Sequence, residues 1–166
     1  MGLGRPIALY ALPGDSGPMT TGCLRGRILV PQEVFTRLDR EQMSALLAHE
    51  VAHLARRDPL WTLLGQVICD LFFFQPLNRC TRQQLRVEAE YLADRQAVGV
   101  LTDRLGLARC LATLGEWSLA RAPGVIAHPP PAVGVSPYHS ILALRIERIL
   151  ERLEPKGGRH PCAGRL

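Results

Sequence analysis

The feature that most restricts the fold of this chain is an HExxH motif inside an apolar stretch, residues 46–55. Residues four apart lie on one face of an α-helix, one turn above each other. His49 and His53 would therefore direct two imidazoles at a common point, as a tetrahedral Zn²⁺ requires of two of its ligands. Glu50 follows the first histidine, where its carboxylate can act as general base on water. An ordinary helix that happens to carry these residues is the alternative, because so short a motif recurs by chance.

Sequence signals flank the motif on both sides. Asp39 followed by Gln42 forms a capping box, which predicts that the motif helix begins there and runs to about Arg57. Pro59 breaks that helix but suits the first turn of the next one, which Asp58 can cap. The HExxH motif is therefore expected near the end of one helix, just before a second.

The second helix is expected over residues 59–74, the most apolar part of the chain, which ends in three phenylalanines. Thr81 and Gln84 form another capping box, which predicts a third helix that ends at about Val98. Asp70 interrupts the apolar run, so we expect a helical hairpin and not a single membrane span. The aromatic tip of this hairpin is expected to be buried or to dip into a membrane.

The hairpin carries the missing metal ligand. At 1.5 Å per residue its first helix extends about 24 Å from Asp58, and the return to Glu90 covers about 21 Å, which brings Glu90 level with His53. Glu90 therefore suits a third ligand, and Asp94 suits the orienting partner of a ligand histidine. Glu88 competes with Glu90, but the two lie about 200° apart around the helix, so only one can face the zinc. A solvated helix face is the alternative for this acidic pair.

The flanking regions indicate an α+β fold that is mainly helical. Apolar runs at residues 7–12 and 27–30 predict a β-hairpin or a three-stranded sheet, with an irregular arm as the alternative. Residues 32–37 suit a turn of helix. We expect a single domain over residues 1–155 and a disordered tail over residues 156–166.

Two amphipathic helices are expected after the hairpin. The first covers residues 103–121, and the second starts after Ser136 and Pro137 and ends at about Leu153. Between them, the stretch rich in proline and glycine at residues 122–137 is expected to be a loop.

Composition excludes one class of function and suggests a compartment. The net charge is +5, yet the arginines are scattered without a basic run, so we expect no nucleic-acid partner. The five cysteines are widely spaced and form no CxxC pair, which indicates reduced thiols in a reducing compartment.

These motifs together resemble the BlaR/MecR-type family of membrane zinc peptidases. The resemblance covers about residues 20–100, and it is carried by residues 22–31, 46–53, 57–60, 73–76 and 90–94. The ExxxD signature after HExxH is also shared, more distantly, with the HtpX and CAAX prenyl endopeptidase family.

Both families are gluzincins, so the resemblance implies a zincin-like domain with a small N-terminal β-element, an HExxH helix and a helical hairpin. It implies that His49, His53 and Glu90 bind one Zn²⁺ per chain, that Glu50 activates water and that Asp94 orients a ligand. The expected activity is zinc-dependent hydrolysis of protein or peptide substrates, in signalling or in membrane protein quality control. A non-catalytic zinc-binding sensor or interaction domain of a membrane receptor is the alternative.

A last segment, His139 with Arg145 and Ile146, resembles the H-P-x-x-x-x-R-I segment of the HtpX-type domain, although Ser140 replaces the proline. His139 or Tyr138 is thus a candidate catalytic residue beside the transition-state oxyanion, and a packing role is the alternative.

The resemblance also bears on partners and location. It implies association with a membrane or with transmembrane helices, for which the residues 72–74 are the candidate surface. We expect a membrane-associated protein at the cytoplasmic face, with a soluble cytoplasmic protein as the alternative.

Overall fold

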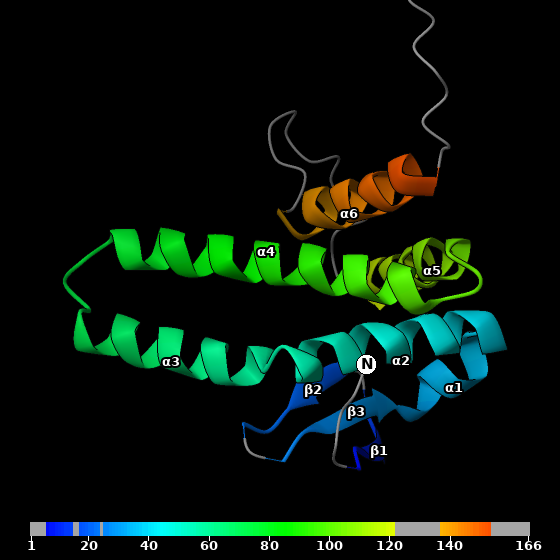
Figure 1. The fold of residues 1–166 in the computed structure, drawn as a ribbon, viewed down its shortest axis with the longest axis horizontal. Helices are drawn as coiled ribbons and strands as arrows, with labels where there is room; N and C mark the ends of the chain where they lie inside the picture. Colours follow the sequence, from blue (N-terminus) through cyan, green and yellow to red (C-terminus); the bar gives the residue numbers. More distant parts are fainter. Residues whose placement is uncertain (1–5, 15–16, 24, 122–136, 154–166) are drawn as a thin grey trace, which may run out of the picture.

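The computed structural model describes residues 6–14, 17–23, 25–121 and 137–153. The fold is α+β and mainly helical (Figure 1). Its elements, in chain order, are β1 (Ala8–Leu12), β2 (Met19–Thr21), β3 (Arg27–Pro31), α1 (Gln32–Arg37), α2 (Arg40–Ala55), α3 (Asp58–Leu71), α4 (Leu77–Val100), α5 (Leu105–Arg121) and α6 (Pro137–Leu153).

The strands form a three-stranded sheet in the order β1-β3-β2. β1 runs parallel to β3, so the two apolar runs identified in the sequence do not form a hairpin with each other. The hairpin partner of β3 is the short strand β2, which pairs with it antiparallel. Alternation along β3 buries Ile28 and Val30, and the sheet lies along α2 (Figure 1). The prediction of a small three-stranded sheet is confirmed.

The α2 helix begins as the capping box predicted. The carboxylate of Asp39 accepts a hydrogen bond from the Gln42 backbone N–H at 2.7 Å, and the Gln42 side chain accepts one from the Asp39 N–H at 3.0 Å. These bonds satisfy backbone donors that a helix N-terminus otherwise leaves unpaired. The predicted turn of helix before it is α1.

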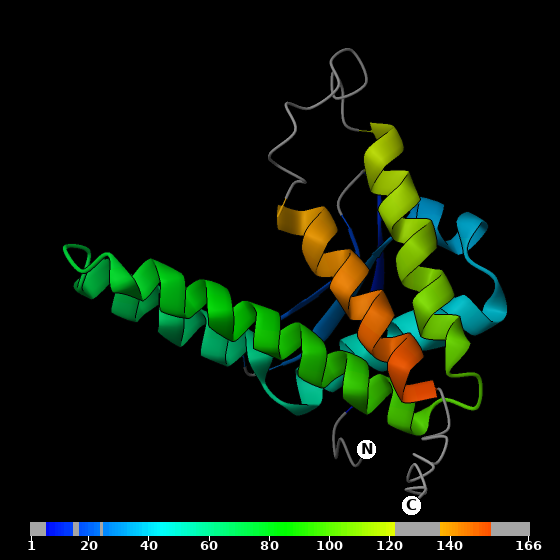
Figure 2. The same cartoon turned by 90° about the horizontal axis from the view of Figure 1, so that it is seen from above.

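The α3–α4 hairpin extends beyond the rest of the molecule (Figure 2). The predicted start of its second helix at Thr81 is wrong, because α4 begins four residues earlier at Leu77. Thr81 lies inside the helix, where its hydroxyl donates to the Leu77 carbonyl at 3.1 Å, an arrangement that lets a threonine sit within a helix. The predicted stop after Val98 also moved, since α4 continues to Val100.

The first helix of the hairpin ends at Leu71, so the predicted helical end at residue 74 is also wrong. Phe72, Phe73 and Phe74 form the turn. The expectation of a buried tip is contradicted for this chain: the three side chains are 46%, 81% and 70% exposed. No residue of α3 is buried, because the hairpin projects away from the cores that could cover it.

Two apolar clusters hold α2 at the centre of the fold. One lies between the sheet, α1, α2 and α5, and the other joins α2 to α4, α5 and α6. The buried members of the first are Ile28, Val30, Val34, Leu38, Leu46, Leu54, Cys110 and Trp117. Those of the second are Ala45, Ala97, Val98, Leu107, Ala108, Leu111 and Ile149. Packing on both sides therefore fixes the helix that carries the HExxH motif.

Within the described part of the chain, no helix combines the length and the apolar character that crossing a membrane requires. The predicted loop at residues 122–137 falls almost wholly outside the described residues, as does the predicted tail at 156–166. The single domain over residues 1–155 stays a prediction. The two later amphipathic helices are α5 and α6.

Candidate metal centre

Two helices bring together the three side chains identified as metal ligands. His49 and His53 lie one turn apart on α2, and their Nε2 atoms are 3.1 Å apart. Glu90 comes from α4, with its carboxylate oxygens 3.5 Å from His49 Nε2 and 3.9 Å from His53 Nε2. One ligand atom from each residue lies within 4.8 Å of the other two.

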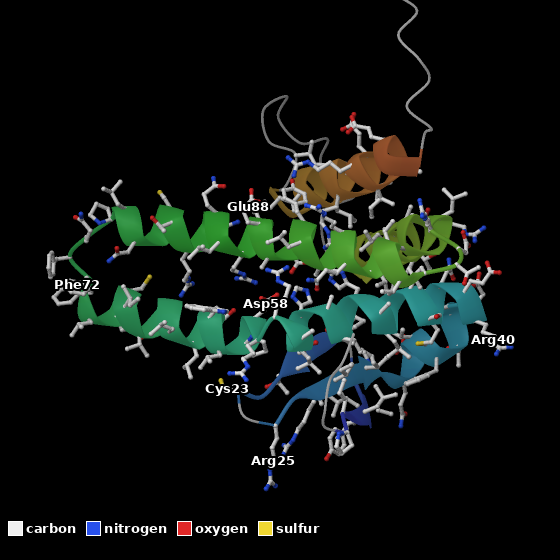
Figure 3. All side chains as sticks on the ribbon, in the orientation of Figure 1. Cys23, Arg25, Arg40, Asp58, Phe72 and Glu88 are labelled. Atoms are coloured by element: carbon white, nitrogen blue, oxygen red, sulfur yellow. The ribbon has the colours of Figure 1, made fainter. Side chains whose placement is uncertain are left out.

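Glu90, and not Glu88, faces the histidines. Glu88 is exposed and lies on the side of α4 that faces away from α3 (Figure 3). The helical angle of about 200° between the two positions accounts for this difference. The length of the hairpin also agrees with the helical rise per residue, because Glu90 returns to the level of His53 near the C-terminal end of α2.

His49 is held by a carboxylate and an arginine from two other helices. Its Nδ1 lies 2.9 Å from Asp94 Oδ1 on α4. Asp94 in turn accepts two hydrogen bonds from Arg145 on α6, from Nε at 2.7 Å and from Nη2 at 2.8 Å. Arg145 Nη1 also lies 2.9 Å from Glu90 Oε2. The guanidinium thus joins two acidic residues of α4 to each other and to α6.

The charges of this cluster shift its pKa values. Burial alone would lower the pKa of His49, but its contacts with Asp94 and Glu90 outweigh burial and raise that pKa to about 9. Burial would raise the pKa of Asp94, yet the hydrogen bonds from Arg145 and His49 lower it to about 2. The pKa of Glu90 is likewise lowered to about 2, against burial, by His49 and Arg145. Both carboxyl groups are therefore ionised at neutral pH.

His53 has a matching arrangement, which was not predicted from the sequence. Its Nδ1 lies 2.7 Å from Asp58 Oδ2, at the start of α3. Asp58 was expected to cap α3, but the N-cap position is taken by Arg57, and the Asp58 side chain turns to the histidine. Arg56 Nη2 lies 3.4 Å from the other carboxylate oxygen, Asp58 Oδ1.

The donor set fits a divalent transition metal. In the neutral imidazole that binds metal, a carboxylate at Nδ1 favours the tautomer that carries its hydrogen there, which leaves the Nε2 lone pair of each ring for a metal ion. Two lone pairs 3.1 Å apart repel unless a proton or a cation lies between them. Two imidazoles and one carboxylate are a ligand set of zinc sites that retain an open position.

The candidate base is anchored to the sheet. Glu50 is 6% exposed, and the hydroxyl of Thr20 on β2 donates a hydrogen bond to Glu50 Oε2. The same hydroxyl lies 3.3 Å from the Glu50 carbonyl oxygen. The candidate base therefore lies between the HExxH helix and β2, the strand at one edge of the sheet.

Sequence reasoning did not identify Thr20, Arg56 or Asp58 as site residues, and it gave Arg145 no role. Asp58 carried a usable signal, since it follows His53 by five residues across a helix break. The side chain of His139, the remaining candidate, lies outside what the structure describes, although its backbone belongs to α6.

Comparison with known proteins shows similarity to a family of peptidases. Residues 1–110 match the family model described as BlaR1 peptidase M56. The methicillin resistance mecR1 protein of Staphylococcus aureus is 23% identical over 84 residues, which are 51% of this chain and 14% of that protein. The regulatory protein BlaR1 of Bacillus licheniformis is 25% identical over 101 residues, 61% of this chain and 17% of that one.

A relative of a second kind is the protease HtpX homolog of Halobacterium salinarum, 32% identical over 72 residues, which are 43% of this chain and 25% of that protein. The aligned region thus spans a quarter or less of the length of each of these relatives. The family match covers most of this chain, including the HExxH motif and the hairpin that returns to it. The chain therefore belongs to the BlaR1 peptidase M56 family.

Proposed function

We propose that this chain is a zinc-dependent endopeptidase domain of the gluzincin type, which hydrolyses peptide bonds of protein substrates. The observation that carries the proposal is the convergence of one ligand atom each from His49, His53 and Glu90, with Glu50 between the two histidines in the sequence. A purely structural zinc site closes with a fourth protein ligand and has no use for a base at that position. Membership of a peptidase family points to the same class of reaction.

The three ligands would hold one Zn²⁺, which when bound polarises a scissile carbonyl and makes water more acidic. Glu50 would accept the proton of the attacking water and pass it to the leaving amine. Thr20 holds this carboxylate through its hydroxyl. Asp94 keeps Nδ1 of His49 engaged, so that Nε2 is free to bind metal.

The substrate in this proposal is an extended segment of protein chain. In the described part of the sheet, β2 pairs with β3 on one side only, and its Thr20 touches the candidate base. An extended peptide could add to the free edge of β2, where main-chain hydrogen bonds would bind it beside the site. Its scissile bond would then lie close to Glu50.

The test is to compare the wild-type chain with Glu50→Gln, measuring zinc content and casein hydrolysis on the same samples. The base is not a ligand, so the variant should keep one zinc per chain and lose at least about 10²-fold in rate. A variant that lost its zinc, or that cleaved casein as fast as the wild type, would contradict the role of Glu50. Zinc binding in both proteins without hydrolysis in either would favour the alternative, a zinc-binding sensor or interaction domain.

We also propose that the hairpin tip associates with a membrane. Phe73, Phe74 and Leu77 are each more than 60% exposed, and the exposed apolar surface continues along α3. The one charged residue in the stretch 59–77 is Asp70, whose carboxylate accepts a hydrogen bond from Gln66 at 2.7 Å. Exposed apolar surface of this extent marks an interaction site.

The cytoplasmic face is the proposed location, because the four cysteines in the described residues are free thiols and a reducing compartment preserves them. The membrane test is the binding of liposomes by the purified chain, with a second copy of the chain as the competing occupant. A dimer that ignores liposomes would favour the second copy.

A further inference from the structure

We propose that Asp58 and Arg56 are positioning residues that hold His53 in its metal-binding orientation. The inference rests on the proposed metal site. Asp58 Oδ2 lies 2.7 Å from His53 Nδ1, the distance of a strong, charge-assisted hydrogen bond. Both side chains are only 13% exposed. Asp58 would fix the ring and its tautomer, so that Nε2 faces Glu90 and His49.

The backbone before Asp58 is held in an unfavourable conformation. Arg57 has φ 58° and ψ 35°, and it is the only non-glycine residue with positive φ among those described. The left-handed region costs a residue with a side chain about 1–2 kcal/mol. Such strain persists where the surrounding structure over-determines it, often at functional sites. Here it makes the sharp turn from α2 to α3 and brings the carboxylate back to a histidine five residues earlier.

Arg56 connects this turn to the helix of the third ligand. Its Nη2 lies 3.4 Å from Asp58 Oδ1, and its Nη1 donates to the Ala89 carbonyl at 3.0 Å. Ala89 directly precedes Glu90, so the contact ties the backbone at Glu90 to the turn that holds His53. Figure 3 shows Asp58 at the junction of α2 and α3, on the side that faces α4.

The arrangement repeats the one around the other histidine. His49 contacts Asp94, which Arg145 holds, and Arg145 reaches Glu90 directly. Each histidine therefore has its own carboxylate, each carboxylate has its own arginine, and each arginine contacts the segment of the third ligand. This correspondence indicates that Asp58 does more than an ordinary acidic residue at a helix N-terminus, which only stabilises the helix by about 0.3–1 kcal/mol.

The experiment measures zinc affinity by competition with a chelator in the wild type, Asp58→Asn and Asp58→Ala. Loss of a residue that orients a metal ligand costs about 10- to 100-fold in metal affinity, and we expect the asparagine, which can still accept a hydrogen bond, at the lower end. Asp70→Asn is the matched control, since it removes the same charge from the same helix where the carboxylate contacts Gln66. The control should bind zinc like the wild type.

A second readout separates positioning from folding. The absorption spectrum of the Co²⁺-substituted protein reports ligand geometry, and it should change in Asp58→Asn and stay unchanged in Asp70→Asn. Equal zinc affinities and equal spectra in these two variants would overturn the inference. If neither Asp58 variant folds, Arg56→Met gives the same two readouts and should also weaken zinc binding.

Variants of the proposed ligands distinguish an error in the role of Asp58 from an error in the assignment of the metal site. Glu90→Ala and His53→Ala remove proposed ligands and should lose zinc far more completely than Asp58→Asn. If both ligand variants bound zinc like the wild type, the metal assignment would be wrong. If they lost zinc while Asp58→Asn and Asp58→Ala kept full affinity, only the role of Asp58 would be refuted.

Discussion

Removal of Arg145 should destabilise the metal-free protein more than removal of any exposed arginine. Its side chain is 12% exposed and makes two hydrogen bonds to Asp94, which is 6% exposed. Arg145→Met fills a similar volume but leaves both Asp94 and Glu90 without the guanidinium. The expected result is a large fall in the free energy of unfolding, measured in chelator at pH 7.

The magnitude follows from two independent considerations. The pKa of Asp94 falls from 3.8 to about 2, and at about 1.4 kcal/mol per unit this corresponds to about 2.5 kcal/mol, shared between Arg145 and His49. Breaking a buried ion pair by removing one partner costs about 3–5 kcal/mol. We expect a loss of about 3 kcal/mol, which lowers the Tm by about 6–12 °C for a chain of this size.

The pH of the assay matters for this comparison. A depressed carboxyl pKa stabilises the fold fully above the unfolded value of 3.8, and the contribution is lost as the pH falls through about 2. At pH 7 the whole contribution of Asp94 is therefore present.

The matched control is Arg109→Met. Arg109 is 52% exposed, and it contacts Glu41 at 3.0 Å and Asp103 at the surface. Exposed ion pairs contribute about 0–1 kcal/mol, so this variant should unfold within about 1 kcal/mol of the wild type. If urea denaturation gave the two variants equal stability, the expected stabilising role of Arg145 between α4 and α6 would be refuted.

Three further predictions concern other parts of the molecule. Burial raises the pKa of the Cys110 thiol to about 12, whereas the ordinary thiol value is 9. Above pH 9 the thiol therefore loses its proton in the unfolded state first, and the free energy of unfolding should fall by up to about 1.4 kcal/mol per pH unit. Urea denaturation between pH 9 and 11 should show a shallower fall for Cys110→Ala than for the wild type. Phe72→Ser with Phe73→Ser should weaken liposome flotation and leave zinc affinity alone, whereas undiminished flotation would exclude the hairpin tip. Glu88→Gln should bind zinc like the wild type while Glu90→Gln should not, and the reverse order in a zinc titration would exchange their roles.

Local signals predicted the elements that carry the candidate site. The Asp39 capping box located the start of α2, and the length of the hairpin located Glu90 beside His53, because both depend on residues close in sequence and on fixed helical geometry. The choice of Glu90 over Glu88 needed only the angle between successive residues on a helix.

The contacts that complete the site could not be predicted in the same way. Arg145 and Thr20 reach the site from segments far from the motif, so their contacts depend on how α6 and β2 pack against α2 and α4. Asp58 resembled a helix cap, and nothing in the sequence announced that Arg57 would take the left-handed conformation that turns Asp58 toward His53. The pattern at Thr81 suggested a helix start, but a threonine hydroxyl satisfied within the helix gives the same sequence signature.

An anomalous difference map from a crystal of the zinc-loaded chain, recorded at the zinc absorption edge, would locate the metal directly. We expect one peak about 2.0–2.2 Å from a nitrogen of His49, a nitrogen of His53 and a carboxylate oxygen of Glu90, with the Glu50 carboxylate outside the ligand set. A peak bound by Glu88, a peak with Glu50 as a ligand, or no peak between the two histidines would contradict this expectation.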